Sequence, residues 1–272
     1  MKTLIARSRS ILVRVLFFVA ILLGIKSAVH FAGLEVISIN ALFSGVIGAN
    51  IFLLSFLLSG VLADFKESER IPGEIASILL TMADEFDSSY HLKKNPLAKT
   101  GLSECLDLGV GIDDWLHKRI RTQDLMRRLQ LLYRTASRLE GAVTLTYIPR
   151  LKQEHHNLRK LIIRIHTIRE TNFISSGYLI ATTTTLFLMI GLVLVRVDPF
   201  YESLFFTGVI AYLMLFLILL IHDLDNPFGY YENSSSEDVS LKPLDDARAE
   251  LAARLEEIDR SWEDGSVPKE GT

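Results

Sequence analysis

The 272-residue chain lacks most of the motifs and residue clusters that are typical of enzymes and metal-binding proteins. Its single cysteine, Cys105, excludes an intrachain disulfide framework and any metal site built from several cysteines. The sequence contains no phosphate-binding P-loop, G-x-G-x-x-G, H-E-x-x-H or G-x-S-x-G motif. With 29 basic and 32 acidic residues the net charge is −3, which gives no indication of nucleic-acid binding. We therefore expect neither an enzyme nor a partner of nucleic acids.

The chain has long runs of residues that carry no charge. Hydrophobic residues make up 49% of the sequence and the mean hydropathy is +0.30, although 22% of the residues are charged. Three runs lack Asp, Glu, Lys, Arg and His altogether: Val36–Ala63, Thr171–Val195 and Ser203–Ile221. A membrane-spanning helix needs about 17 to 25 mostly apolar residues, so each run predicts one span. A buried helix of a soluble protein is the less favoured interpretation.

Ile11–Ile25 is a weaker candidate for a fourth span, because Arg14 interrupts it and Lys26 and His30 follow it. Its length and the basic residues before it are also typical of a signal peptide. The sequence has no clear cleavage site there, and apolar residues resume at 28–32. Arg14 can extend to the lipid headgroups from near a helix end. We therefore expect a retained first span.

The distribution of Lys and Arg predicts the orientation in the membrane. The N-terminal stretch carries four of them, and the two short connections on the opposite side carry one each. The positive-inside rule then places both termini and the long middle segment in the cytoplasm. The chain is thus predicted to be a multi-pass integral membrane protein in contact with lipid. The bacterial inner membrane is the expected location because no other address signal is present.

These patterns divide the chain into five consecutive parts. They are an N-terminal cytoplasmic segment with the first two spans at 1–63, a cytoplasmic helical region at 64–170, the last two spans at 171–222, an acidic linker with an amphipathic helix at 223–264, and a disordered tail at 265–272. The predicted fold class is all-α, a four-span transmembrane helical bundle with a helical cytoplasmic region.

Helical spacing of apolar residues supports this fold class in the cytoplasmic parts. One predicted face consists of Leu125, Leu129, Leu132, Ala136 and Leu139. Asn95–Pro96 and Gly109–Gly111 are expected to form turns. A last helix is expected to start near Pro243, with an apolar face made by Leu244, Ala247, Leu251, Leu255, Ile258 and Trp262.

The second run has one side of small or polar residues when it is drawn as a helix. This stripe is about 120° wide and begins with Asn40; Phe52 lies within it and Phe56 at its edge. Its candidate pore-lining residues, which we call the neck stripe, are Ser44, Gly48, Phe52, Ser55, Phe56 and Ser59. Small residues and hydroxyls permit close packing between membrane helices. Alternatively the stripe lines water, and Phe52 with Phe56 forms an apolar constriction that gates by dewetting. The second interpretation requires a symmetric ring of subunits, because one chain with four spans cannot enclose a pore.

Two motifs and the order of the segments carry a resemblance to a known family. I-H-D-L-D-N-P-F-G occupies Ile221–Gly229 directly after the last run, and F-K-E-S-E-R-I-P-G occupies Phe65–Gly73 after the second. L-L-S-F at Leu53–Phe56 lies inside the second run. The chain resembles the bestrophins, pentameric ion channels with four spans per subunit and a large helical cytoplasmic region. Pro72 departs from the family pattern, which has Trp at this position.

The resemblance implies an oligomeric, pentameric channel that passes small inorganic ions passively. Phe52 and Phe56 fall on the family's neck positions, and Gly48 lies one turn before them. Chloride is a candidate ion, although the residues themselves leave the choice between anions and cations open. The alternative function is a non-conducting membrane scaffold whose cytoplasmic helices bind a protein partner.

Calcium is the one cofactor that the resemblance suggests. In animal members of the family, the acidic stretch after N-P-F-G helps to hold calcium. Calcium takes six to eight oxygen ligands, and here the candidates for such a clasp are Asp223, Asp225, Glu232, Glu237 and Asp238. A solvated acidic linker is the favoured interpretation. The four hydroxyls of Thr182–Thr185, in the third run, are likewise expected to bond the backbone or a helix interface rather than a ligand.

Overall fold

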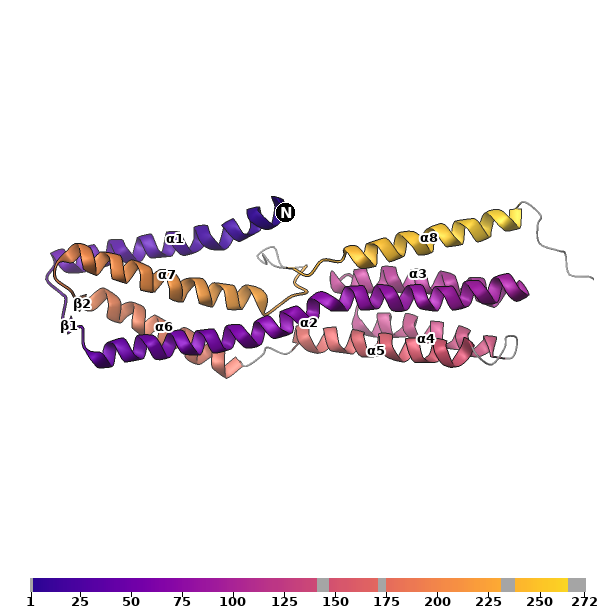
Figure 1. Ribbon diagram of the computed structural model, residues 1–272, viewed down its shortest axis with the longest axis horizontal. Coiled ribbons are helices and arrows are strands. Elements are labelled where there is room, and N and C mark those ends of the chain that lie inside the picture. The colour runs from indigo at the N-terminus through magenta and orange to yellow at the C-terminus, as the bar shows by residue number, and fades with distance from the viewer. Residues whose placement is uncertain (1, 141–146, 171–174, 231–237, 264–272) are drawn as a thin grey trace, which may run out of the picture. The chain divides into compact units, whose positions relative to one another are not determined.

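The computed structural model describes residues 2–140, 147–170, 175–230 and 238–263 (Figure 1). The expected tail at 265–272 lies outside these residues. The elements, in chain order, are α1 (Lys2–Phe31), β1 (Ile37–Ser38), α2 (Ala41–Lys93), α3 (Pro96–Leu116), α4 (Thr122–Leu139), α5 (Tyr147–Glu170), α6 (Ser175–Leu194), β2 (Val195–Arg196), α7 (Phe200–Leu224) and α8 (Lys242–Glu263). The helical fold class is confirmed.

Contacts between residues divide the chain into two compact units. The first comprises Met1–Lys66, Thr171–Pro227 and Ser234–Asp238, and the second comprises Glu67–Glu170, Phe228–Asn233 and Val239–Thr272. Helix α2 contributes its first part to one unit and its second part to the other. It continues through Pro72, although proline removes one backbone hydrogen bond from a helix interior.

The first unit contains the apolar helices. Helices α1, α2, α6 and α7 are each long and apolar enough to cross a membrane, which confirms the four expected spans by length and composition. Within this unit α1 packs against α6 and α7. Many large apolar side chains stay exposed on its outer faces, among them Phe17, Phe187 and Phe205. Exposed apolar surface on this scale is expected where lipid tails replace water.

The second span starts later than the uncharged run does. Helix α2 begins at Ala41 because Asn40 caps it: the backbone N–H of Phe43 donates to Asn40 Oδ1 at 2.8 Å. The preceding residues Ile37–Ser38 pair instead with Val195–Arg196 as a short parallel ladder. This pairing joins the two connections at one end of the unit, and local hydropathy did not predict it.

The second unit is a helical bundle built on the predicted apolar faces. The face of α4 that was expected from spacing is buried throughout. Asn95 caps α3, since its Oδ1 accepts from the N–H of Leu97 at 2.9 Å, so the expected break at Asn95–Pro96 is confirmed. The expected turn at Gly109–Gly111 is wrong, because α3 runs through it.

The glycines of α3 make room for side chains of neighbouring helices. A Cβ added at Gly101 would lie 2.3 Å from the Phe86 ring, and one at Gly111 would lie 2.9 Å from Arg128 Cδ. At Gly109 the nearest atom would be Arg248 Cγ, at 3.1 Å. The two glycines that suggest a turn in the sequence are therefore packing positions inside a continuous helix.

Helix α8 covers α3 in this unit. It begins at Lys242, as expected from Pro243, and its residues Leu244, Ala247, Leu251 and Ile258 are buried. Ion pairs flank the apolar contact: Arg248 lies 3.4 Å from Asp113, and Arg254 lies 2.5 Å from Asp84. These four residues of the predicted apolar face are therefore covered by the same chain, Leu255 is half-buried, and the side chain of Trp262 lies outside the described residues.

Candidate functional site

The neck stripe lies on one side of α2 and is not covered by its own unit. Ser44, Gly48, Ser55 and Ser59 are exposed. Phe52 is 75% exposed and Phe56 is 58% exposed. A Cβ added at Gly48 would meet nothing within 4 Å, so this glycine is not needed for close packing inside the chain.

The opposite side of α2 carries the packing within the unit. Leu54, Leu57 and Val61 are almost completely buried. Asn50 is 1% exposed, and its Nδ2 donates to Thr185 Oγ1 of α6 at 2.8 Å. A polar bond between spans of this kind holds two helices in register where water is absent. The helix thus has a fixed, buried back and an uncharged front.

The front of α2 offers hydroxyls and aromatic rings but no ionised group. Ser55 Oγ donates to the carbonyl of Ile51 at 2.8 Å and so satisfies its hydrogen inside the helix. Its oxygen can still accept a hydrogen bond from water. Such a surface can be wetted beside Ser44 and Ser59 and can exclude water beside Phe52 and Phe56.

The structure also reveals a charged cluster that sequence reasoning missed. Lys26 is completely buried, and its Nζ lies 2.6 Å from Glu35 Oε1. The same ammonium donates to the carbonyl oxygens of Val193, at 3.3 Å, and of Val195. Lys26 therefore ties the end of α1 to the α1–α2 connection and to the start of β2.

His30 completes this cluster. Its Nδ1 lies 2.9 Å from Glu35 Oε2, and its ring stacks on Phe200 with centroids 3.9 Å apart. Burial opposes the ionisation of Glu35, but the bonds from Lys26 and His30 outweigh it and hold the pKa of this carboxyl below its ordinary value. One feature of the sequence could have indicated the cluster. Between Val15 and Ala63 the only Lys, Arg, His, Asp or Glu residues are Lys26, His30 and Glu35.

The candidate calcium ligands do not gather among the described residues. Asp225 Oδ1 accepts a hydrogen bond from the Tyr178 hydroxyl at 2.7 Å. Glu232 and Glu237 lie outside the described residues. Elsewhere in the described part of the chain, no three His, Cys, Asp or Glu side chains come close enough together to hold a metal ion.

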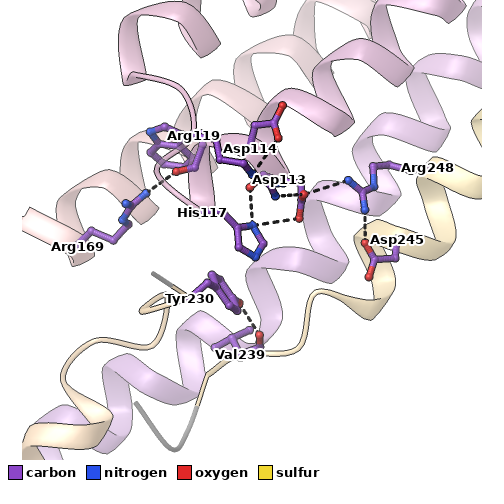
Figure 2. Close-up of polar contacts among 10 residues, drawn as sticks. Asp113, Asp114, His117, Arg119, Arg169, Tyr230, Val239, Asp245 and Arg248 are labelled. Carbon is purple, nitrogen blue, oxygen red and sulfur yellow. Dashed lines mark hydrogen bonds and ion pairs between the residues drawn. The ribbon is translucent and has the colours of Figure 1, made fainter. Parts of the chain in front are cut away.

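After N-P-F-G the chain enters the second unit through an aromatic contact (Figure 2). The ring of Tyr230 lies 5.2 Å from that of His117, and its hydroxyl donates to the carbonyl of Val239. His117 Nδ1 lies 2.9 Å from the carbonyl of Asp113, whose carboxylate pairs with Arg248. The contact between the Tyr230 and His117 rings and the hydrogen bond from Tyr230 to Val239 thus hold the segment around Tyr230 against the end of α3.

Comparisons with known proteins identify the fold. No protein-family model matches the sequence, and no curated protein matches it. A crystal structure of a bacterial bestrophin homolog from Klebsiella pneumoniae matches with a TM-score of 0.73 and 16% identity over 90% of this chain and 98% of that chain. A variant of that homolog matches with a TM-score of 0.73 and 17% identity, covering 90% and 99% of the two chains. A structure described as a membrane protein matches with a TM-score of 0.69, 18% identity, and coverage of 90% and 96%.

Proposed function

We propose that this chain, which has the fold of the bacterial bestrophin homologs, is a subunit of an oligomeric channel through which small ions cross a membrane passively. The observation that carries the proposal is the uncharged front of α2, where Phe52 is 75% exposed and Phe56 58% exposed while the back of the helix is buried. Copies of this surface can enclose a common axis in a closed ring of subunits. A pentameric ring is the form that the resemblance implies.

In such a ring the neck stripe would line the narrowest part of the pathway. Ser44, Gly48, Ser55 and Ser59 would face water, and the rings of Phe52 and Phe56 would form the apolar constriction. A narrow apolar segment empties of water easily, and ions then meet a high barrier. Small movements of α2 would change the radius at these rings and with it the flow of ions.

The stripe carries no ionised side chain, so its net charge favours neither sign of ion. Chloride is the first ion to test because of the family resemblance, with potassium measured in parallel. Purified protein in liposomes is expected to pass one of these ions down its gradient. Replacing both rings, Phe52→Ala with Phe56→Ala, should raise the passive flux because the apolar constriction is removed.

The matched control is Phe187→Ala with Phe205→Ala. These two rings are also exposed on apolar helices but lie outside the stripe, so their loss should leave the flux unchanged. Absence of flux in the wild-type protein would contradict the channel and leave the scaffold function. An unchanged flux in the Phe52→Ala, Phe56→Ala protein would contradict the gate.

The ring itself is tested by the mass of the purified complex. Native mass spectrometry in detergent should give the mass of five chains of 30.7 kDa each. A monomer or a dimer would argue against any pore that is lined by one helix per subunit.

A further inference from the structure

A cavity of about 200 Å³, partly open to the surface, lies in the first unit between α2, α6 and α7. Its apolar wall includes Leu54 and Leu57 of α2 and Ala181 of α6, all of which are almost completely buried. In another protein an apolar cavity of about 150 Å³ stays dry and binds benzene. This space therefore suits a molecule somewhat larger than benzene.

Unpartnered polar groups also line this cavity. The Thr182 hydroxyl and the His222 ring both line it, and neither has a hydrogen-bond or ion-pair partner among the residues that the structure describes. Both residues are exposed, so these polar groups lie where the cavity opens to the surface of the unit. Two other threonines of the run, Thr183 and Thr185, bond the backbone or another helix as the sequence predicted. Thr183 Oγ1 donates to the carbonyl of Leu179 at 2.7 Å, and Thr185 accepts from Asn50.

The Tyr178 hydroxyl adds a third polar atom to the lining. It donates its hydrogen to Asp225 at 2.7 Å, which leaves its oxygen able to accept. Polar groups beside hydrocarbon cost free energy until they are hydrogen-bonded. The lining thus combines a large apolar wall with a few convergent polar atoms, which is the usual composition of a small-molecule site.

We infer that this cavity binds a small uncharged amphiphile, such as a medium-chain alcohol dissolved in the membrane. Its hydroxyl would bond Thr182 and His222, and its apolar body would pack against Leu54 and Leu57. An ionised head group is disfavoured, because none of the described residues that line the cavity is Lys, Arg, Asp or Glu and a charge beside hydrocarbon is costly without a charged partner.

The cavity lies behind the part of α2 that carries the proposed gate. At 100° per residue, Leu54 points about 180° away from the midpoint between Phe52 and Phe56. A molecule in the cavity would support α2 from its back and change how far the helix can move. This regulatory step rests on the proposed function, whereas the binding itself does not.

Photolabelling with azioctanol, a photoreactive medium-chain alcohol, tests the binding on the full chain in liposomes. Mass spectrometry should locate the label on the lining residues of α2, α6 and α7. Ala181→Phe should abolish this label by filling the cavity. Thr182→Val keeps the shape but removes one hydrogen bond, so half-maximal labelling should need about three- to tenfold more alcohol.

Thr183→Val is the matched control, because Thr183 bonds its own helix and does not line the cavity; it should label as the wild type does. Thr182→Val serves as the deciding variant if Ala181→Phe does not fold. Label spread evenly over lipid-facing residues, or unchanged in the deciding variant, would overturn the site.

Unlabelled octanol should change the ion flux of the wild-type protein and of Thr183→Val, but not that of Ala181→Phe. Equal effects of octanol on all three proteins would overturn the regulatory step. If the wild-type protein passes no ions, the channel proposal fails, while the photolabel still decides whether the cavity binds the alcohol.

Discussion

Lys26 shows how much one residue can depend on its partners. Moving an ammonium out of water costs several kcal/mol, and only close, well-placed partners offset this cost. Lys26 has a carboxylate at 2.6 Å and two backbone carbonyls. The two carbonyls belong to Val193, near the end of α6, and to Val195 of β2, both far from Lys26 in the sequence. The cluster therefore stabilises the end of the unit only when the end of α1 lies against α6 and β2.

Lys26→Met is expected to lower the free energy of unfolding by about 3 to 5 kcal/mol, because it leaves Glu35 buried without its main partner. The double variant Lys26→Met, Glu35→Gln should regain part of this loss. Denaturant unfolding in detergent measures both. Arg14→Met, which removes an exposed cation from the same helix, is the control. A loss in Lys26→Met no larger than in the control would contradict the importance of the cluster.

The lowered pKa of Glu35 predicts a dependence of stability on acid pH. Since the folded state favours the carboxylate, the stabilisation is complete above the ordinary pKa of 4.5 and is lost as the pH falls through the lower pKa of the folded state. The difference in Tm between the wild type and Glu35→Gln should thus be constant near neutral pH and shrink below pH 4.5. A difference that grows on acidification would contradict the sign.

At the scale of the elements, α3 shows that a glycine can mark a contact rather than a turn. Gly101 faces the ring of Phe86 on α2 at a distance that admits no side chain. Gly73 also lies within a helix, but a Cβ there would meet nothing within 4 Å. The same substitution should therefore have opposite effects at the two positions.

Gly101→Ala should destabilise the protein by about 1 to 3 kcal/mol, because Phe86 must move to admit the methyl group. Gly73→Ala should be neutral or stabilise by up to about 1 kcal/mol, since alanine loses less backbone entropy in a helix. Thermal unfolding of the two variants in detergent compares them directly. Equal destabilisation by both would show that the contact with Phe86 is unimportant.

At the scale of the whole molecule, the distribution of basic residues predicts which ends of the spans face the cytoplasm. Cys105 is buried, and burial raises the pKa of its thiol, so it should not react with maleimides. Single cysteines can therefore report the orientation in otherwise unchanged protein. Leu34, in the α1–α2 connection, and Ser240, before α8, are both exposed.

In intact spheroplasts of a bacterial host, a membrane-impermeant maleimide should label Leu34→Cys but not Ser240→Cys. Permeabilising the membrane should make both positions reactive, which controls for accessibility. Labelling of Ser240→Cys alone before permeabilisation would mean that the orientation is reversed.

Much of the architecture could be predicted from the sequence, because it depends on residues that are neighbours along the chain. Three uncharged runs and the weaker apolar segment Ile11–Ile25 predicted four spans. Helical spacing predicted the buried face of α4, and Asn95–Pro96 predicted a break between helices. The neck stripe could be listed because all its members lie on one helix. Its role in a pore remains a prediction, since it depends on neighbouring subunits.

The tertiary structure decided the features that join distant segments. In the folded chain Lys26 lies beside Glu35 and the carbonyl of Val193. The glycines of α3 contact side chains of neighbouring helices, and Thr182 lines a cavity. Hydropathy and periodicity depend on neighbours along the chain, so they determine where helices form and which side is apolar. Which polar group meets which partner depends on how the helices pack, because each such pair is completed by a residue from another part of the chain.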